Sequence, residues 1–311
     1  MRRLESLGEC LFPQDPGHWV EVLRIGLGLQ LTLYAWSLRQ DWVSLFSTAR
    51  NGLVNRALAE AVLSGESPFT PRLGWIVHLG CAIGVSEAAT LWWIWLILFG
   101  LGVFLLTGFY SRIAAILTWF VFLSVVKSGT VFSYGVDNLT VIGLFYLMIA
   151  PQPERSILWA SRKTRSVVNP ERYGFHRRIL QLHLCIIYFF AGISKALGPE
   201  WWNGVSIWKA LTRPPFDVIP PDVLIRFEPL FPLAGIAVCL IETCYAIFIW
   251  PEKVRPFWLC AILLMHLSIG LTMGLYLFAL IMIVLNLAAF GPGLVWRRAA
   301  DSVRPTAVSL S

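Results

Sequence analysis

Long apolar runs, separated by short polar segments, make up most of the chain. A membrane-spanning helix needs about 20 predominantly apolar residues. Runs near this length lie at residues 18–39, 91–109, 112–127, 137–151, 179–197, 229–250 and 257–290. Helices that are apolar on every side are typical of membrane spans rather than of surface helices in soluble proteins. The pattern therefore predicts an all-α, polytopic helix bundle embedded in a membrane.

The last of these runs is too long for a single crossing. Residues 257–290 contain no charged residue, and one straight helix over them would be ~51 Å long against a hydrocarbon core of ~30 Å. We expect two short spans with a break near Gly270–Gly274. This brings the predicted number of crossings to about eight.

Two segments between the predicted spans also show an arrangement of apolar and polar residues that predicts local structure. Residues 75–84 are apolar but short, which predicts a re-entrant or interfacial piece, and Gly80 and Gly84 have the spacing that permits close helix contact. The polar loop 40–74 is expected to hold a short helix at 52–63.

Basic residues predict the orientation in the membrane. The loop 151–178 contains seven arginines and lysines, and loops rich in these residues stay in the cytoplasm. An even number of crossings then places both termini in the cytoplasm. We expect a cytoplasmic N-terminal segment (1–17), a transmembrane domain (18–291) and a cytoplasmic tail (292–311).

The composition supports the membrane assignment. Hydrophobic residues make up 57% of the chain and charged residues only 14%, against about 25% charged residues in soluble domains. The net charge of +7 would suit nucleic acid, but the basic residues cluster in short loops between spans. We therefore expect a lipid bilayer as partner, no nucleic acid, and a multi-pass location in the cell's inner or plasma membrane.

The cysteines do not suggest a metal site. The six cysteines lack metal-ligand spacing, and most lie inside apolar segments, where cysteine behaves as a small hydrophobic residue. We expect neither a metal nor a disulfide.

Ionisable residues inside a bilayer are costly, so each is a candidate for function. Lys195 lies near the outer end of its span, and Asp137 lies at the outer start of another, so both could join Trp201 and Tyr134 in an outer-rim cluster. Lys195 either extends to the membrane surface or, when desolvated, acts as a base. Asp137 either caps its helix or binds a ligand. The two aromatic residues either stack on a flat ring or belong to the aromatic belt.

A second polar pair is predicted deeper in the membrane. Glu242 and His266 lie at depths that agree within ~3 Å on neighbouring spans. Glu242 is expected to form a structural ion pair with Arg24 or to pair with His266. His266 is either a hydrogen-bonded bundle histidine or a catalytic residue.

One stretch, "ILQLHLCIIYFFAGISKALGPEWWNGVSI" (179–207), resembles a known family. The matching residues are Gln181, Tyr188, Ala191, Gly192, Lys195, Trp201 and Gly204. They resemble the HTTM family, the membrane domain shared with vitamin K-dependent gamma-carboxylase, and residues 133–151 and 265–290 resemble two further blocks of it.

The resemblance implies a function and a set of site residues. In the carboxylase a lysine acts as base toward a reduced quinone, and Lys195 matches that position. We therefore expect an enzyme at the outer membrane face, carboxylase- or epoxidase-like, with a quinone-like cosubstrate. Its catalytic residues would be Lys195 and His266, and its binding residues Asp137, Tyr134, Tyr188 and Trp201.

The carboxylase also has a large extracytoplasmic domain, whereas only about 20 residues follow the last span of this chain. The layout is more similar to small bacterial members, including the membrane component that matures a sporulation-delaying peptide toxin. An accessory role in maturing a secreted peptide, without chemistry of its own, is the alternative function. A transporter ranks third, because the spans show no inverted repeat.

Overall fold

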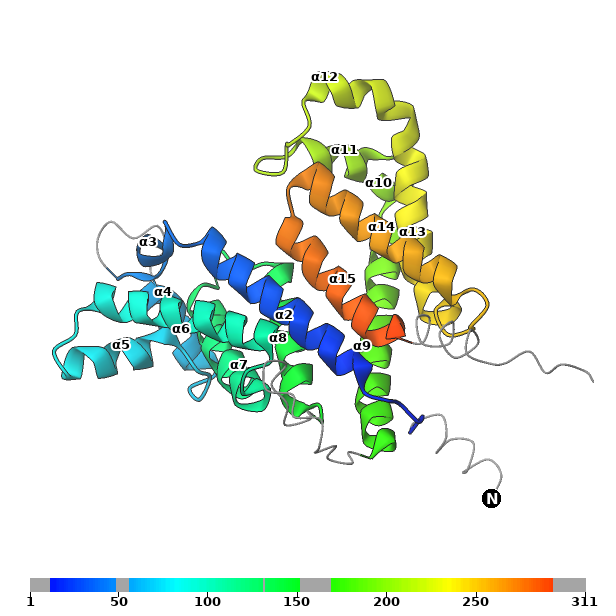
Figure 1. Cartoon of the computed structure of the whole chain (residues 1–311). Helices are drawn as coiled ribbons and strands as arrows, with labels where there is room; N and C mark the ends of the chain where they lie inside the picture. Colours follow the sequence, from blue (N-terminus) through cyan, green and yellow to red (C-terminus); the bar gives the residue numbers. More distant parts are fainter. Residues whose placement is uncertain (1–11, 49–55, 131, 152–168, 293–311) are drawn as a thin grey trace, which may run out of the picture. The chain divides into compact units, whose positions relative to one another are not determined.

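The computed structural model describes residues 12–48, 56–130, 132–151 and 169–292. These residues form helices joined by turns, with no strand among them (Figure 1). The chain divides into two compact units: Val20–Asn169, called here the N-terminal unit, and Met1–Trp19 with Pro170–Ser311, called here the C-terminal unit. The predicted all-α class is confirmed for the residues described.

Five helical stretches are long and apolar enough to cross a membrane, so the chain is compatible with a multi-pass integral membrane protein. They are α6 (Glu87–Thr107), α7 (Ser111–Ser128), α9 (Pro170–Ala196), the continuous stretch Pro221–Phe248, and α14 (Arg255–Met273). The fourth stretch contains α12 (Pro221–Leu224), η2 (Ile225–Leu230) and α13 (Phe231–Phe248).

The other predicted spans are helical but do not meet this standard of length and hydropathy. α8 (Gly135–Ile149) and α15 (Tyr276–Phe290) are shorter apolar helices, as is α5 (Leu73–Ala82), which covers most of the predicted re-entrant or interfacial piece 75–84. α2 (His18–Ser37) has 20 residues, but Glu21, Arg24 and Gln30 reduce its mean hydropathy. The count of eight crossings therefore stays a prediction.

The predicted break in the long apolar run is confirmed. α14 ends at Met273, Gly274 adopts the left-handed conformation with φ of 71°, and α15 begins at Tyr276. Glycine reaches this conformation without a Cβ clash, so it is suited to ending the helix. α14 and α15 then pack against each other as a hairpin within the C-terminal unit (Figure 1).

In the C-terminal unit, α9 and α13 pack side by side (Figure 1). α10 (Pro199–Trp202) and α11 (Val205–Thr212) also contact α13. α15 packs on α9 and α14 packs on α13, so four long or apolar helices surround the interior of this unit.

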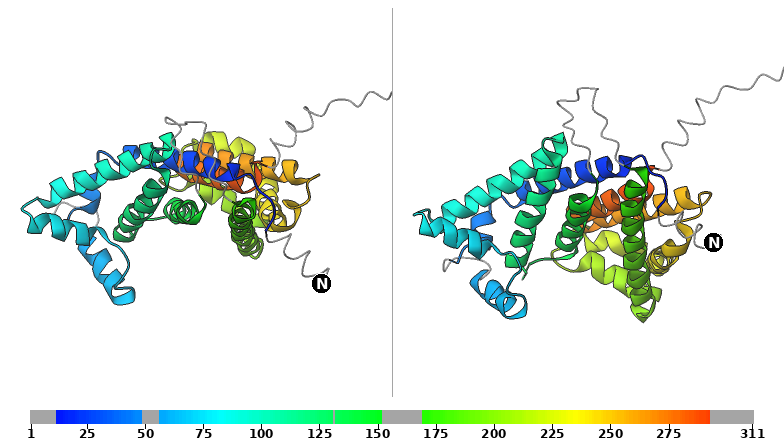
Figure 2. Two further views of the ribbon diagram at one scale, coloured as in Figure 1. Left: turned by 60° about the horizontal axis from the view of Figure 1, so that its bottom comes forward. Right: turned by 90° about the horizontal axis from the view of Figure 1, so that it is seen from below.

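In the N-terminal unit, α5, α6, α7 and α8 pack in chain order (Figure 2). Thr90 of α6 lies directly against Gly80 of α5, while Gly84 faces open space, so the predicted close contact involves Gly80 only. The short helix predicted at 52–63 is α4 (Arg56–Glu66), next to α3 (Trp42–Phe46) in the chain. Residues 1–11, 152–168 and 293–311 lie outside the described residues, and with them most of the predicted terminal segments and basic loop.

Candidate functional site

An ion pair lies between the two helices that pack most extensively in the C-terminal unit. Lys195 Nζ of α9 lies 2.5 Å from Glu242 Oε2 of α13. The Glu242 side chain is 8% exposed and the Lys195 side chain 25% exposed. The carboxylate is therefore enclosed, while the lysine side chain is partly exposed.

Close packing of α9 on α13 brings these two charges together. A Cβ on Gly192 would lie 2.5 Å from the backbone nitrogen of Thr243, so the backbones meet one turn before Lys195. Farther along, Gly235 lies directly against the backbone of Trp201. The two helices are therefore antiparallel, and small residues let them approach closely.

The ion pair joins two residues that the sequence predicts at different depths. The sequence predicts Lys195 at an outer rim because its apolar run, 179–197, ends two residues later, and in the structure α9 ends at Ala196. Beyond this end, α10 continues alongside α13. Glu242 follows the first residue of α13, Phe231, by about 11 residues, or ~16 Å at helical rise. Lys195 lies level with Glu242 along α13 because the chain after the end of α9 continues alongside α13.

A buried hydrogen-bond network lies about two helical turns away on the same face of α9. The Tyr188 hydroxyl lies 2.9 Å from His266 Nε2 of α14 and accepts a 2.6 Å hydrogen bond from Asn286 Nδ2 of α15. Asn286 Oδ1 accepts a 2.7 Å hydrogen bond from the Tyr245 hydroxyl of α13. One network therefore joins four helices of the unit, and it includes two predicted residues, Tyr188 and His266.

His266 still has an unused hydrogen-bonding atom. Its Nδ1 is buried and has no hydrogen-bond partner within the described part of the chain. Buried polar atoms are nearly always paired, so an unpaired nitrogen is a plain candidate for a ligand contact. The ring is bordered by Tyr188, at 5.8 Å between centroids, and by Phe278, at 5.7 Å.

Aromatic rings extend from this network to the ion pair. The rings of Tyr188 and Tyr245 lie 4.4 Å apart between centroids, and Lys195 Nζ lies 5.6 Å from the ring centroid of Trp201. An ammonium at this distance from a tryptophan ring makes a cation–π contact. The predicted residues Lys195, Trp201, Tyr188 and His266 therefore belong to one region of the C-terminal unit.

The partner found for Glu242 differs from the one predicted. Glu242 binds Lys195 rather than Arg24 or His266. Arg24 belongs to α2 in the N-terminal unit, where its Nη1 donates to the carbonyl oxygens of Leu105 and, at 3.2 Å, Leu106. These carbonyls lie in the last turn of α6, where backbone acceptors lack helical partners and favour a cation.

Asp137 and Tyr134 also lie in the N-terminal unit. Asp137 Oδ2 accepts a 2.9 Å hydrogen bond from the Tyr134 backbone nitrogen at the start of α8. The hydroxyl groups of Tyr34 and Ser133 lie next to the same buried carboxylate. Burial and the charge of Asp137 raise the pKa of the Tyr134 phenol above its ordinary value. These contacts give Asp137 the helix-start role that was one of its two predicted roles.

Two members of the network, Asn286 and Tyr245, were not predicted. Both had a signal in the sequence. Asn286 is an amide within the uncharged run 257–290, and Tyr245 follows Glu242 by three residues, so it shares a helix face with the carboxylate. A search for polar residues inside uncharged runs, and at helical spacing from the ionisable ones, would have included both.

Comparisons with known proteins add no assignment to this site. No family model matches the chain, and neither the curated proteins nor the solved structures contain a match. Within the described ranges, no group of three or more His, Cys, Asp or Glu side chains is arranged to hold a metal ion.

Proposed function

We propose that the protein is a membrane enzyme whose Lys195–Glu242 pair performs acid–base chemistry on a lipophilic cosubstrate with a dissociable hydroxyl. The observation that supports this most strongly is a charged pair between two apolar helices, with the lysine side chain partly exposed and the carboxylate enclosed. Ionisable residues at such places are functional candidates because burying them is costly.

The pair suits proton transfer to and from a bound hydroxyl. Lys195 donates three hydrogen bonds when charged and serves as a base once its proton moves to Glu242. Glu242 holds the ammonium in one orientation. As an ammonium, Lys195 also stabilises an oxyanion formed at the same place.

A reduced quinone is the cosubstrate class that these residues fit. The flat face of Trp201 beside the ammonium suits an aromatic ring, and the unpaired Nδ1 of His266 suits a second polar group. A reduced quinone would supply a dissociable hydroxyl and two electrons. The chain's own part is to orient the ring and to hold or accept the hydroxyl proton at Lys195.

We also propose a family and a membrane topology for the chain. The block around Lys195 supports a small member of the HTTM family, with carboxylase- or epoxidase-like chemistry. We further propose eight crossings formed by α2, α6, α7, α8, α9, α13, α14 and α15, both termini in the cytoplasm, and a site that opens toward the outer face of the cell's inner or plasma membrane.

A fluorescent hydroxynaphthalene tests the site without knowledge of the natural substrate. Its neutral and ionised forms absorb at different wavelengths, so emission excited in the absorption band of the ionised form reports whether the bound hydroxyl has already lost its proton. With protein in lipid nanodiscs near neutral pH, the wild type should bind the probe and show emission from the ionised form. Lys195→Met should lose this emission, and Lys195→Arg should largely lose proton acceptance because arginine stays protonated.

An exposed ion pair of the same unit provides a matched control. Lys209 and Glu200 form a 2.7 Å pair with side chains 59% and 49% exposed. Lys209→Met removes the same charge and should leave the probe's emission unchanged. Equal effects of Lys195→Met and Lys209→Met, or no ionised emission from the wild type, would contradict the proposed base.

A further inference from the structure

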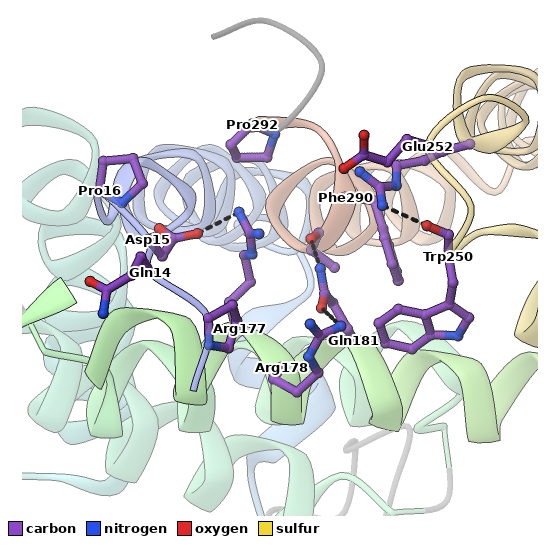
Figure 3. Close-up of a pocket in the computed structure, with 13 residues that line it drawn as sticks. Gln14, Asp15, Pro16, Arg177, Arg178, Gln181, Trp250, Glu252, Phe290 and Pro292 are labelled. Atoms are coloured by element: carbon purple, nitrogen blue, oxygen red, sulfur yellow. Dashed lines mark hydrogen bonds and ion pairs between the residues drawn. The ribbon is translucent and has the colours of Figure 1, made fainter. Parts of the chain in front are cut away.

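A pocket of about 430 Å³ lies at the other end of α9, in the C-terminal unit. Figure 3 shows it between the start of α9, the segment before α2, and the ends of α13 and α15. It does not include Lys195, Glu242 or the hydrogen-bond network. The pocket is therefore separate from the site proposed above, and the inference below does not rest on that proposal.

Positive charge exceeds negative charge in the lining of this pocket. Three arginines line it, Arg177, Arg178 and Arg255, against two carboxylates, Asp15 and Glu252. Asp15 is already engaged, since its Oδ2 lies 2.5 Å from Arg177 Nη1 and its Oδ1 accepts a 2.7 Å hydrogen bond from a backbone amide. The lining thus favours an anion.

One donor in the pocket is left without a partner. Arg177 Nε is buried and has no hydrogen-bond partner among the residues that the structure describes. A buried donor without an acceptor carries a desolvation cost that an added acceptor would remove. The Asp15 ion pair uses Nη1, so the Nε side of the fork remains available for an oxygen of a ligand.

Arg178 is held so that its guanidinium faces the pocket. Its Nη1 donates a 3.2 Å hydrogen bond to Gln181 Oε1, and its guanidinium carbon lies 4.8 Å from the Trp250 ring centroid. Gln181 is fixed in turn by a 2.7 Å hydrogen bond from its Nε2 to the Ala289 carbonyl (Figure 3). Planar guanidinium groups fixed in this way are suited to oxyanions with several oxygens, above all phosphate.

We propose that this pocket binds a phosphate group, carried by an anionic phospholipid or by a soluble phosphate compound. The location favours the lipid, because Arg177 and Arg178 lie in the early turns of α9, just before its apolar run, where phospholipid headgroups meet a spanning helix. Trp250 and Phe290 in the lining provide an apolar wall beside the arginines, which suits the glycerol and first acyl carbons of a lipid.

The experiment measures thermal unfolding of the full chain in detergent against three added compounds. Dioctanoyl phosphatidylglycerol carries the phosphate on a lipid, dioctanoyl glycerol lacks the phosphate, and inorganic phosphate lacks the lipid. We expect phosphatidylglycerol to raise the melting temperature in a saturable way and dioctanoyl glycerol to have no such effect. Saturation by inorganic phosphate at a similar concentration would identify a soluble phosphate compound as the source.

Two variants and one control connect the effect to the pocket. Arg178→Gln should raise the half-saturating concentration of phosphatidylglycerol roughly tenfold, the value of one charge-assisted hydrogen bond. Arg177→Lys keeps the positive charge opposite Asp15 but removes the Nε donor, and should also weaken binding. Arg172→Gln removes an exposed charge from the same helix, outside the pocket lining, and should bind as the wild type does.

Three results would overturn the proposal. One is equal stabilisation by phosphatidylglycerol and by dioctanoyl glycerol. Another is no stabilisation by any phosphate compound. The third is the same half-saturating concentration for Arg178→Gln and Arg172→Gln, with both variants as stable as the wild type before lipid is added.

Discussion

The coupling between Lys195 and Glu242 gives the most quantitative test of the structure. At 2.5 Å and an effective dielectric constant of ~20, two unit charges attract by about 7 kcal/mol. Desolvation of both groups and the partial exposure of Lys195 offset most of this attraction. We therefore expect a net coupling energy of about 2 kcal/mol, within the range for hydrogen bonds to charged groups.

The single variants should differ in a definite order. Lys195→Met leaves an enclosed carboxylate without its cation, so it should lower the free energy of unfolding by about 3 kcal/mol. Glu242→Gln leaves a lysine whose side chain is already partly exposed and keeps an oxygen acceptor, so a loss of about 2 kcal/mol is expected. The double variant should lose about 2 kcal/mol less than the sum of the two, because neither partner is then left alone.

The assay is unfolding in mixed detergent micelles with increasing dodecyl sulfate, followed by tryptophan fluorescence. The free energies of wild type, both single variants and the double variant give the coupling directly. Glu200→Gln in the exposed pair is the control and should change stability by less than about 1 kcal/mol. Additive losses in the double variant, or a loss for Glu242→Gln no larger than for Glu200→Gln, would refute the enclosed ion pair.

Two further predictions concern helix packing and the buried network. Gly192→Ala should lower the free energy of unfolding by about 2–3 kcal/mol, because its Cβ would lie 2.5 Å from the Thr243 backbone nitrogen. Gly100→Ala, with open space around it, should cause no measurable loss in the same assay. Similar losses at both glycines would argue against the close packing. Asn286→Leu should lower the free energy of unfolding by about 2–4 kcal/mol, because two buried tyrosine hydroxyls lose a partner. Adding Tyr245→Phe should restore part of the lost stability. No recovery in the double variant would show that the Tyr245 hydrogen bond contributes little.

The helices were predictable because membrane crossing imposes a length and a hydropathy that a single sequence displays. The division of 257–290 followed from length alone, and it occurs at Gly274, within the predicted interval. The hydropathy of α2 was harder to judge, since Glu21, Arg24 and Gln30 interrupt an otherwise apolar helix. Arg24 and Gln30 are buried within the N-terminal unit.

The pairing inside the site was only partly predictable. The sequence showed which residues are unusual, including Lys195, Glu242 and His266, but not which of them meet. Depth was counted from the ends of the apolar runs, which separated Lys195 from Glu242, and the two meet because α10 continues along α13 after α9 ends. Helix pairing depends on close approaches such as Gly192 on Thr243, and a single sequence does not specify the partner of a small residue.

The most direct test of the proposed site is an experimental density map of the protein in lipid nanodiscs, prepared with the hydroxynaphthalene probe. Our account predicts a flat ring beside Trp201 with its oxygen within hydrogen-bonding distance of Lys195 Nζ, while Glu242 remains bound to the same ammonium. Acyl chains packed over Lys195 with the ring elsewhere, or a Lys195 side chain turned away from Glu242 into the headgroups, would contradict it.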